Sequence, residues 1–139
     1  MKNLKNSVLI IAFALSLFSC SPETQNDALA DPDKDGLSNA MEAKLGTNPN
    51  VADTDGDKIL DGTEDFNKNG TRENTETSAL QRDTDNDGIK DGGEDSNHNG
   101  HLETTETDPL DADSDSDGVS DGDEDSDGDG ESDGDEDND

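Results

Sequence analysis

The stretch that decides the fold runs from residue 83 to residue 106 and reads D-T-D-N-D-G-I-K-D-G-G-E, followed at once by D-S-N-H-N-G-H-L-E-T-T-E. Each half is twelve residues long, with Asp or Asn at its first, third and fifth positions, Gly at its sixth and Glu at its twelfth. This is the spacing of an oxygen-lined cation loop, in which the glycine permits a sharp turn. The stretch therefore predicts two adjacent metal-binding loops.

The same pair of units repeats on both sides of this stretch with a period of 30 residues. Six-residue spacers separate the pairs, and a single unit precedes them. The sequence thus predicts seven loops, at 31–42, 53–64, 65–76, 83–94, 95–106, 113–124 and 125–136. The loop at 53–64 departs from the spacing, because Lys58 stands at its sixth position and a displaced glycine, Gly56, at its fourth. We expect that loop to be strained or reshaped and to bind its ion more weakly.

The composition excludes an ordinary globular core. The 139 residues include 39 Asp+Glu and 9 Lys+Arg, for a formal net charge of −30, and only 24% are hydrophobic. Such a chain cannot offset its conformational entropy by apolar burial. We expect a mostly irregular fold of tandem calcium-binding loops, with a short helical turn near residues 38–45. We expect no nucleic-acid binding, because a basic surface is missing, and no enzymatic activity, because no apolar pocket surrounds the acids.

The acidic residues are concentrated at the ligand positions of the loops. Positions 1, 3, 5, 9 and 12 of the seven units hold Asp, Asn or Glu at all 35 places, which a solvated acidic tail, the competing interpretation, would not produce. Hard oxygen ligands on a flexible backbone favour calcium over magnesium, and zinc would require His or Cys. We expect about seven calcium ions, one per loop.

The expected ligands also include the backbone carbonyl at position 7 of each loop. They are Asp31, Asp33, Asp35, Leu37, Asn39, Glu42, Asp53, Asp55, Asp57, Ile59, Asp61, Glu64, Asp65, Asn67, Asn69, Thr71, Glu73, Glu76, Asp83, Asp85, Asp87, Ile89, Asp91, Glu94, Asp95, Asn97, Asn99, His101, Glu103, Glu106, Asp113, Asp115, Asp117, Val119, Asp121, Glu124, Asp125, Asp127, Asp129, Glu131, Asp133 and Glu136.

The N-terminal segment has a different composition from the rest. Lys2 and Lys5 precede an apolar run over residues 8–18, which is shorter than the about twenty residues of a membrane-spanning helix. This pattern is typical of a secretory signal peptide. The run ends in Leu-Phe-Ser-Cys20, which resembles the bacterial lipobox. The resemblance implies a signal peptide over 1–19, helical if ordered, a lipid on Cys20, and a flexible tether over 20–30. Cleavage after Ala30 of an ordinary secretion signal is the alternative.

The tandem D-x-D-x-D-G-[LIV]-x-D-G-x-E units with T-x-P-x-x-A-D spacers resemble thrombospondin type 3 repeats, in the form found on secreted and lipid-anchored bacterial proteins. The resemblance covers residues 31–139 and implies an irregular chain wrapped around a row of calcium ions. It departs from the pattern at Lys58, and at Ala79 and Arg82 in one spacer. Dockerin modules also use tandem calcium loops, but here only the first loop leaves room for a helix after it.

The few apolar residues of the repeats recur at fixed places. Position 7 of four loops is Leu37, Ile59, Ile89 or Val119. We expect these side chains to pack on the spacer residues Leu45, Val51, Leu80 and Leu110.

Together these features predict a calcium-binding lipoprotein, lipid-anchored at the bacterial cell envelope, with the outer membrane favoured and the side that it faces left open. Its expected role is a calcium-stiffened structural spacer or adhesion module with an envelope or extracellular protein partner. One alternative is a calcium buffer or storage polyanion. Another is a repeat linker of a longer, truncated protein, since residues 137–139 begin an eighth unit.

Overall fold

The computed structural model describes residues 27–125, residue 128 and residues 132–136. The predicted signal segment, the predicted lipidation site Cys20 and most of the predicted tether lie outside the described residues, as do Asp127, Asp129 and Glu131 of the last loop.

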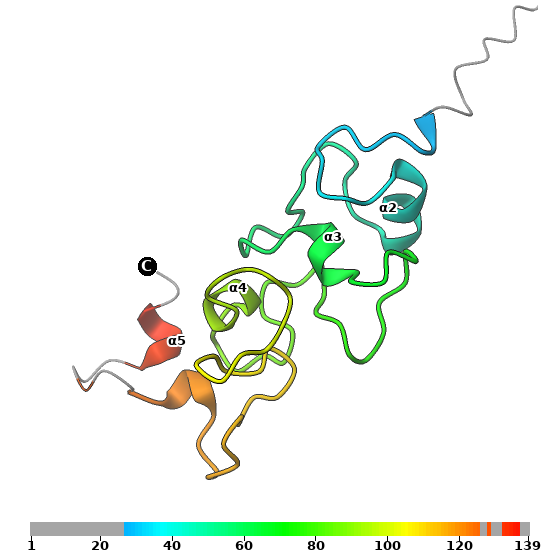
Figure 1. Cartoon of the computed structure of the whole chain (residues 1–139). Helices are drawn as coiled ribbons and strands as arrows, with labels where there is room; N and C mark the ends of the chain where they lie inside the picture. Colours follow the sequence, from blue (N-terminus) through cyan, green and yellow to red (C-terminus); the bar gives the residue numbers. More distant parts are fainter. Residues whose placement is uncertain (1–26, 126–127, 129–131, 137–139) are drawn as a thin grey trace, which may run out of the picture.

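Short helical turns joined by irregular chain make up the described part (Figure 1). They are α2 (Asn39–Leu45), α3 (Asp61–Glu64), α4 (Asp91–Glu94), the 3-10 turn η1 (Asp121–Asp123) and α5 (Asp133–Glu136). No residue of the described ranges belongs to a strand. The mostly irregular fold expected from the sequence is confirmed, and so is the helical turn near residues 38–45. The helical turns within the later loops were not predicted.

Helix α2 follows from the local sequence after the first loop. Its residues N-A-M-E-A-K-L include several of the strongest helix formers. Ser38 precedes it in an extended conformation, and Gly46 ends it with φ 100°, donating its N–H to the carbonyl of Glu42. Only glycine adopts this left-handed conformation without steric cost, so Gly46 fixes the end of the helix.

In each repeated pair of loops we call the leading loop first-type and the following loop second-type; the loop 31–42, which stands alone, has the first-type pattern. The turns α3, α4 and η1 begin at position 9 of the first-type loops 53–64, 83–94 and 113–124. In each of them the backbone N–H at position 9 donates to the carbonyl of the residue before the loop. Asp61 donates to Ala52 at 3.0 Å and Asp91 to Arg82 at 2.8 Å. This hydrogen bond closes the loop, and in α3 and α4 the helical turn then places the position-12 glutamate in the interior, where Glu64 is 2% and Glu94 is 3% exposed.

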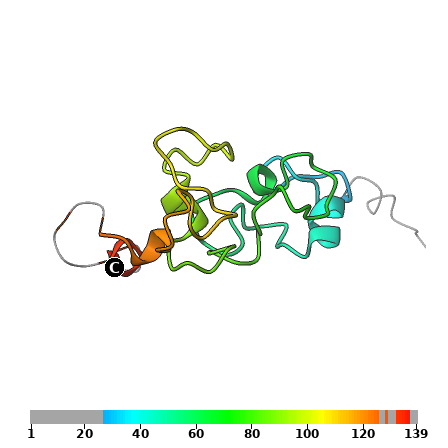
Figure 2. The ribbon, with the colours of Figure 1, turned by 90° about the horizontal axis from the view of Figure 1, so that it is seen from below.

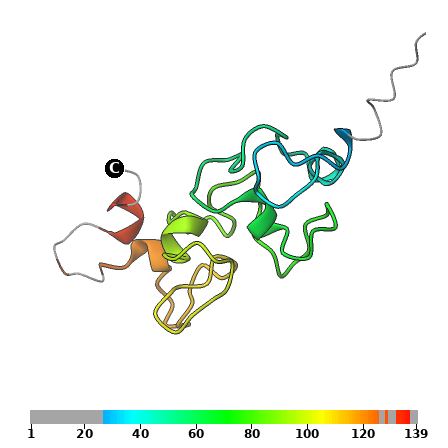
Figure 3. The same cartoon turned by 45° about the horizontal axis from the view of Figure 1, so that its top comes forward.

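The repeats form a row. In three views of the molecule the helical turns follow one another in chain order from the α2 end to the α5 end (Figures 1, 2 and 3). Side chains of one repeat reach the backbone of its neighbour, as where Lys68 donates to the Gly36 carbonyl at 3.1 Å. Such an arrangement is quasi-one-dimensional, and its stability depends on contacts between successive repeats.

The interior of this row is acidic rather than apolar. The buried hydrophobic residues of the described part are only Leu37, Ile59 and Ala79. Eleven acidic residues are buried, and no Lys, Arg or His of the described part is among the buried residues. The buried acids are Asp35, Glu42, Asp57, Asp61, Glu64, Asp65, Glu76, Asp91, Glu94, Asp95 and Asp121.

The expected apolar packing is present only in part. Leu37 and Ile59 are each 1% exposed, but Val51 and Leu80 of the spacers are 41% and 50% exposed. The prediction that spacer side chains cover position 7 is therefore wrong for Val51 and Leu80. The backbone of the next repeat does approach this position, since a Cβ built on Gly62 would lie 3.2 Å from the backbone nitrogen of Leu37.

Candidate metal centres

Each loop is shaped by its first and fifth residues. In the first loop the Asp31 carboxylate accepts the N–H groups of Lys34 at 2.7 Å and Gly36 at 3.2 Å. Asp35 accepts the N–H of Leu37 at 2.7 Å. Equivalent bonds recur in the loop 83–94. These bonds turn the chain around its own carboxylates, which is why the alternating acids converge instead of spreading into solvent.

The loop 53–64 keeps this arrangement although its glycine is displaced. Asp53 accepts the N–H groups of Gly56 at 2.7 Å and Lys58 at 3.1 Å, at the same two positions as in the first loop. The expectation of a reshaped loop is therefore wrong for these hydrogen bonds. The expected strain is present, because Lys58 has φ 94° where the other described loops have glycine. The displaced Gly56, with φ 82°, occupies position 4, which is left-handed in every loop.

One class of acidic cluster lies inside the loops. The carboxylates at positions 1, 3 and 5 contribute one oxygen each, and the three oxygens lie within 4.8 Å of one another. Both oxygens of Asp33 and one oxygen each of Asp55 and Asp85 are buried without a hydrogen-bond partner. The clusters are Asp31, Asp33 and Asp35; Asp53, Asp55 and Asp57; and Asp83, Asp85 and Asp87.

A second class of acidic cluster lies between successive repeats. Asp35 and Glu42 of the loop 31–42 group with Asp61, which belongs to the next first-type loop, again within 4.8 Å. Asp57 and Glu64 group with Asp91 in the same way. The sequence assigned Asp61 to the loop 53–64 and Asp91 to the loop 83–94. The structure places both beside the position-5 and position-12 carboxylates of the preceding repeat.

Each of these position-9 aspartates is held from its own loop. The N–H and hydroxyl of Thr54 donate to the two carboxylate oxygens of Asp61 at 2.7 and 2.6 Å. Thr84 does the same for Asp91 at 2.7 and 2.6 Å. These bonds fix the orientation of the carboxylate while leaving lone pairs on each oxygen for a further partner.

The glutamates at position 12 of the loops 31–42, 53–64 and 83–94 are buried carboxylates without hydrogen bonds. Glu42, Glu64 and Glu94 are 0%, 2% and 3% exposed, and none of their carboxylate oxygens has a hydrogen-bond partner. Burial first, and then neighbouring carboxylates, raise the pKa of Glu64 to about 10, that of Glu94 to about 9 and that of Glu42 to about 7. A buried unpaired carboxylate is costly, so each of these sites requires a proton or a cation.

The second-type loops, 65–76 and 95–106, bring their ligands together differently. The Asn67 amide donates to Glu73 at 2.8 Å and to Glu76 at 2.9 Å, and the Asn69 amide donates to Glu73 at 2.9 Å. Hydrogen bonding of the Glu73 carboxylate, first with Asn69, then with Glu76 and then with Asn67, lowers the pKa of Glu73. An asparagine amide turned by 180° presents its oxygen to the same point. The equivalent residues of the second loop are Asn97, Asn99, Glu103 and Glu106.

The remaining predicted ligands lie in the last repeat. Asp113 accepts the N–H groups of Asp117 and Gly118, both at 3.0 Å, so it contacts the fifth and sixth positions of its loop where Asp31 contacts the fourth and sixth. Asp121 is 4% exposed. In the last loop Asp125 accepts the N–H of Gly128 at 2.7 Å. For the position-7 residues the hydrogen bonds are those of their N–H groups, which donate to the Asp or Asn at position 5 in five loops.

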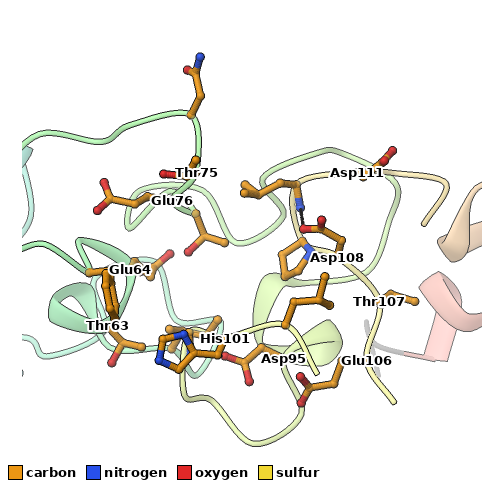
Figure 4. A pocket seen from close by; sticks show the side chains of 18 residues that line it. Thr63, Glu64, Thr75, Glu76, Asp95, His101, Glu106, Thr107, Asp108 and Asp111 are labelled. Carbon is orange, nitrogen blue, oxygen red and sulfur yellow. Dashed lines mark hydrogen bonds between the residues drawn. The ribbon is translucent and has the colours of Figure 1, made fainter. Parts of the chain in front are cut away.

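A polar groove of about 490 Å³ separates the two second-type loops (Figure 4). Glu64 and Thr75 lie on one side of it, Thr107 lies on the other, and His101 lies beside Thr63. The rings of Phe66 and His101 meet edge to face across it, with centroids 5.3 Å apart. The groove thus marks where the loops 65–76 and 95–106 of neighbouring repeats come into contact.

The metal centres described above rest on this chain alone, since no protein-family model, curated protein or solved structure matches it. Within the described ranges, no helix has the length and apolar character needed to cross a bilayer.

Proposed function

We propose that this chain is a calcium-binding structural module whose loops fold around a row of ions. The observation that supports this most directly is the interior of the described part, where eleven acidic residues are buried with no cationic side chain among them and with only three hydrophobic residues. A fold with this interior is stable only if cations or protons compensate the charge. Calcium would therefore take the part that an apolar core takes in other small domains.

The donor set favours calcium over other ions. Every side-chain donor in the acidic clusters is a carboxylate oxygen, and hard oxygens suit calcium, magnesium and manganese rather than zinc or copper. Calcium accepts six to eight oxygens in irregular geometry, whereas magnesium demands a near-ideal octahedron. The loops supply clustered carboxylates on an irregular backbone, and backbone carbonyls and water can complete the coordination. This arrangement suits calcium better than magnesium.

The proposed setting is the bacterial cell envelope, with the chain anchored through Cys20. The support is the sequence alone: a positively charged start, an apolar run of eleven residues and the lone cysteine directly behind it. A calcium-ordered row behind a lipid anchor would act as a spacer or an adhesive stalk. Replacing Cys20 with Ala should remove the protein from the membrane fraction or leave the precursor uncleaved, as measured by fractionation and mass spectrometry. Mature protein that begins at Asp31 without lipid would contradict the anchor.

Calcium titration followed by calorimetry and far-UV circular dichroism tests the proposed function. We expect saturable binding of several ions, with a change in the dichroism spectrum that chelator reverses. The matched control is Glu23→Gln, which removes one negative charge from the tether and should leave the number of bound ions unchanged. Saturable binding without a structural change would favour the calcium-buffer alternative. No saturable binding at millimolar calcium, the weak end of extracellular modules, would refute the proposal.

A further inference from the structure

We infer that a buried cation site lies at each of the first two junctions between successive repeats, in addition to the ion expected inside each loop. The first such site consists of Asp35, Glu42 and Asp61, and the second of Asp57, Glu64 and Asp91. Each is completed by the repeat that follows it in the chain. The inference rests on the proposed function, that the chain binds calcium.

The geometry of the first junction fits one ion. One oxygen each from Asp35, Glu42 and Asp61 lies within 4.8 Å of the other two. Oxygens bound to a calcium ion at about 2.3–2.6 Å are at most about 5 Å apart. The three residues are 6%, 0% and 0% exposed. The site is therefore enclosed within the fold, unlike a group of acids on the surface.

Three carboxylate oxygens at this junction have no hydrogen-bond partner. Both oxygens of Glu42 and one oxygen of Asp35 are buried without a hydrogen-bond partner, and Asp61 is held in place by Thr54. Three carboxylates that face one another repel, and no Lys, Arg or His of the described part is among the buried residues. A divalent cation at their centre removes the repulsion and satisfies the unpaired oxygens.

The junction site and the loop site share a ligand. Asp35 belongs both to the cluster with Asp31 and Asp33 and to the cluster with Glu42 and Asp61. One of its oxygens accepts the N–H of Leu37, and the other is buried and free of hydrogen bonds. Asp57 has the same double membership at the second junction. An aspartate in this position bridges two neighbouring ions.

The close approach of the repeats depends on the residue after the position-9 aspartate. A Cβ on Gly62 would overlap the carbonyl oxygen of Asp35, and a Cβ on Gly92 would overlap that of Asp57. The first loop, which has no loop before it in this chain, carries Asn39 and Ala40 at these two positions instead of Asp and Gly. The dipeptide Asp-Gly at positions 9 and 10 thus accompanies the docking of one repeat on its predecessor.

A double-mutant comparison on the full-length chain tests the junction site. Glu42→Gln, Asp61→Asn and the two together are prepared, and bound calcium ions are counted by native mass spectrometry at the lowest calcium concentration that saturates the wild type. Because both residues hold the same ion, we expect each single variant to lose one ion and the double variant to lose no more than one. If every ion were held within one loop, the two changes would affect different loops and the double variant would lose two ions.

Two controls separate ion binding from folding. Thr54→Val removes the hydroxyl that donates to Asp61 but keeps the carboxylate, and it should retain the full number of ions. The pair Glu42→Gln and Asp53→Asn touches a junction site and a loop site, so it should lose two ions. If the first junction variants lose their dichroism signal, the same comparison is made at the second junction with Glu64→Gln and Asp91→Asn.

The outcomes are distinct. Loss of two ions in the Glu42→Gln and Asp61→Asn double variant, or retention of all ions in Asp61→Asn, would overturn the junction site and leave calcium binding by the loops intact. A wild-type chain that binds no calcium would instead refute the proposed function on which the inference rests.

Discussion

Lys58 holds a backbone conformation that glycine holds at the sixth position of the other described loops. Its φ of 94° lies in the left-handed region, which costs a non-glycine residue of order 1 kcal/mol. The loop nevertheless keeps both hydrogen bonds to Asp53. The strain is therefore stored at one residue without changing the geometry of the ligands around it.

Replacing Lys58 with Gly should relieve this strain. We expect the calcium-loaded protein to be stabilised by about 1 kcal/mol, measured as a shift of the midpoint in urea denaturation. Lys58→Ala is the matched control, because it removes the same charge but keeps the Cβ that causes the strain. An equal gain in both variants would show that the lysine charge, and not its backbone, limits the stability of this loop.

The buried glutamates make the metal-free fold sensitive to pH. In the folded state burial raises the pKa of Glu64 from 4.5 to about 10 and that of Glu94 from 4.5 to about 9. Between these limits the folded chain binds more protons than the unfolded one, so the stability of the metal-free fold falls as pH rises.

In the presence of chelator we therefore expect more ordered structure at pH 5 than at pH 9, measured by far-UV circular dichroism. Calcium reverses this trend, because protons compete with the ion and its affinity increases with pH. Glu64→Gln should flatten the pH dependence of the chelated protein. A metal-free spectrum that stays constant across this range would contradict the proton-linked account.

At the scale of the elements, the short turns α3 and α4 connect one repeat to the next. Their first residue, Asp61 or Asp91, reaches the preceding loop. Their second residue, Gly62 or Gly92, allows the two backbones to touch. A four-residue helix has too few hydrogen bonds to be stable by itself, so these turns depend on the junction that they help to form.

Gly92→Ala should disrupt the second junction, since its Cβ would overlap the carbonyl oxygen of Asp57. Overpacking of this kind costs about 1–3 kcal/mol, and we expect a loss of stability in this range by urea denaturation with calcium present. Gly93→Ala is the control, because residue 93 is exposed and the equivalent positions carry Thr63 and Asp123. Equal effects of the two changes would show that helix propensity, and not the close contact, decides the outcome.

The elements also show where inference from the sequence succeeds and where it stops. The twelve-residue spacing predicted the convergence of Asp31, Asp33 and Asp35, because local hydrogen bonds suffice to form a loop. It did not predict that Asp61 would lie beside Glu42, because the contact joins residues of different repeats and depends on how they stack. The sequence did hold a sign of this contact: the first unit, which has no preceding repeat to contact, has Asn39 at position 9, whereas every other unit has Asp or Glu there.

The whole molecule is a row of repeats whose cohesion depends on cations. The chain has a formal net charge of −30, and much of that charge lies in the acidic clusters between and within the loops. The expectation of a stiffening ion could be drawn from composition alone, because so few apolar residues cannot order a chain of this length. The contacts at its junctions required the structure.

Removal of calcium should expand the molecule. An unfolded chain of residues 20–139 has a radius of gyration of about 35 Å, and repulsion between the freed carboxylates should bring the chelated protein to that value or above it. Small-angle scattering with and without chelator measures the change, and sodium chloride at matched ionic strength separates screening from specific binding. A radius that does not change on chelation would show that calcium leaves the chain as disordered as before.

The junctions also give the array a direction and a unit of length. At the first two junctions a repeat offers two carboxylates to its successor, and the successor contributes one. The paired loops from residue 53 onward recur every thirty residues, so a block of that length would present the same carboxylates at both of its ends. Inserting or deleting such a block would keep the same order of loops at every junction. The length of the array can therefore change in units of one thirty-residue repeat without a change in the residues that form the contacts at either end.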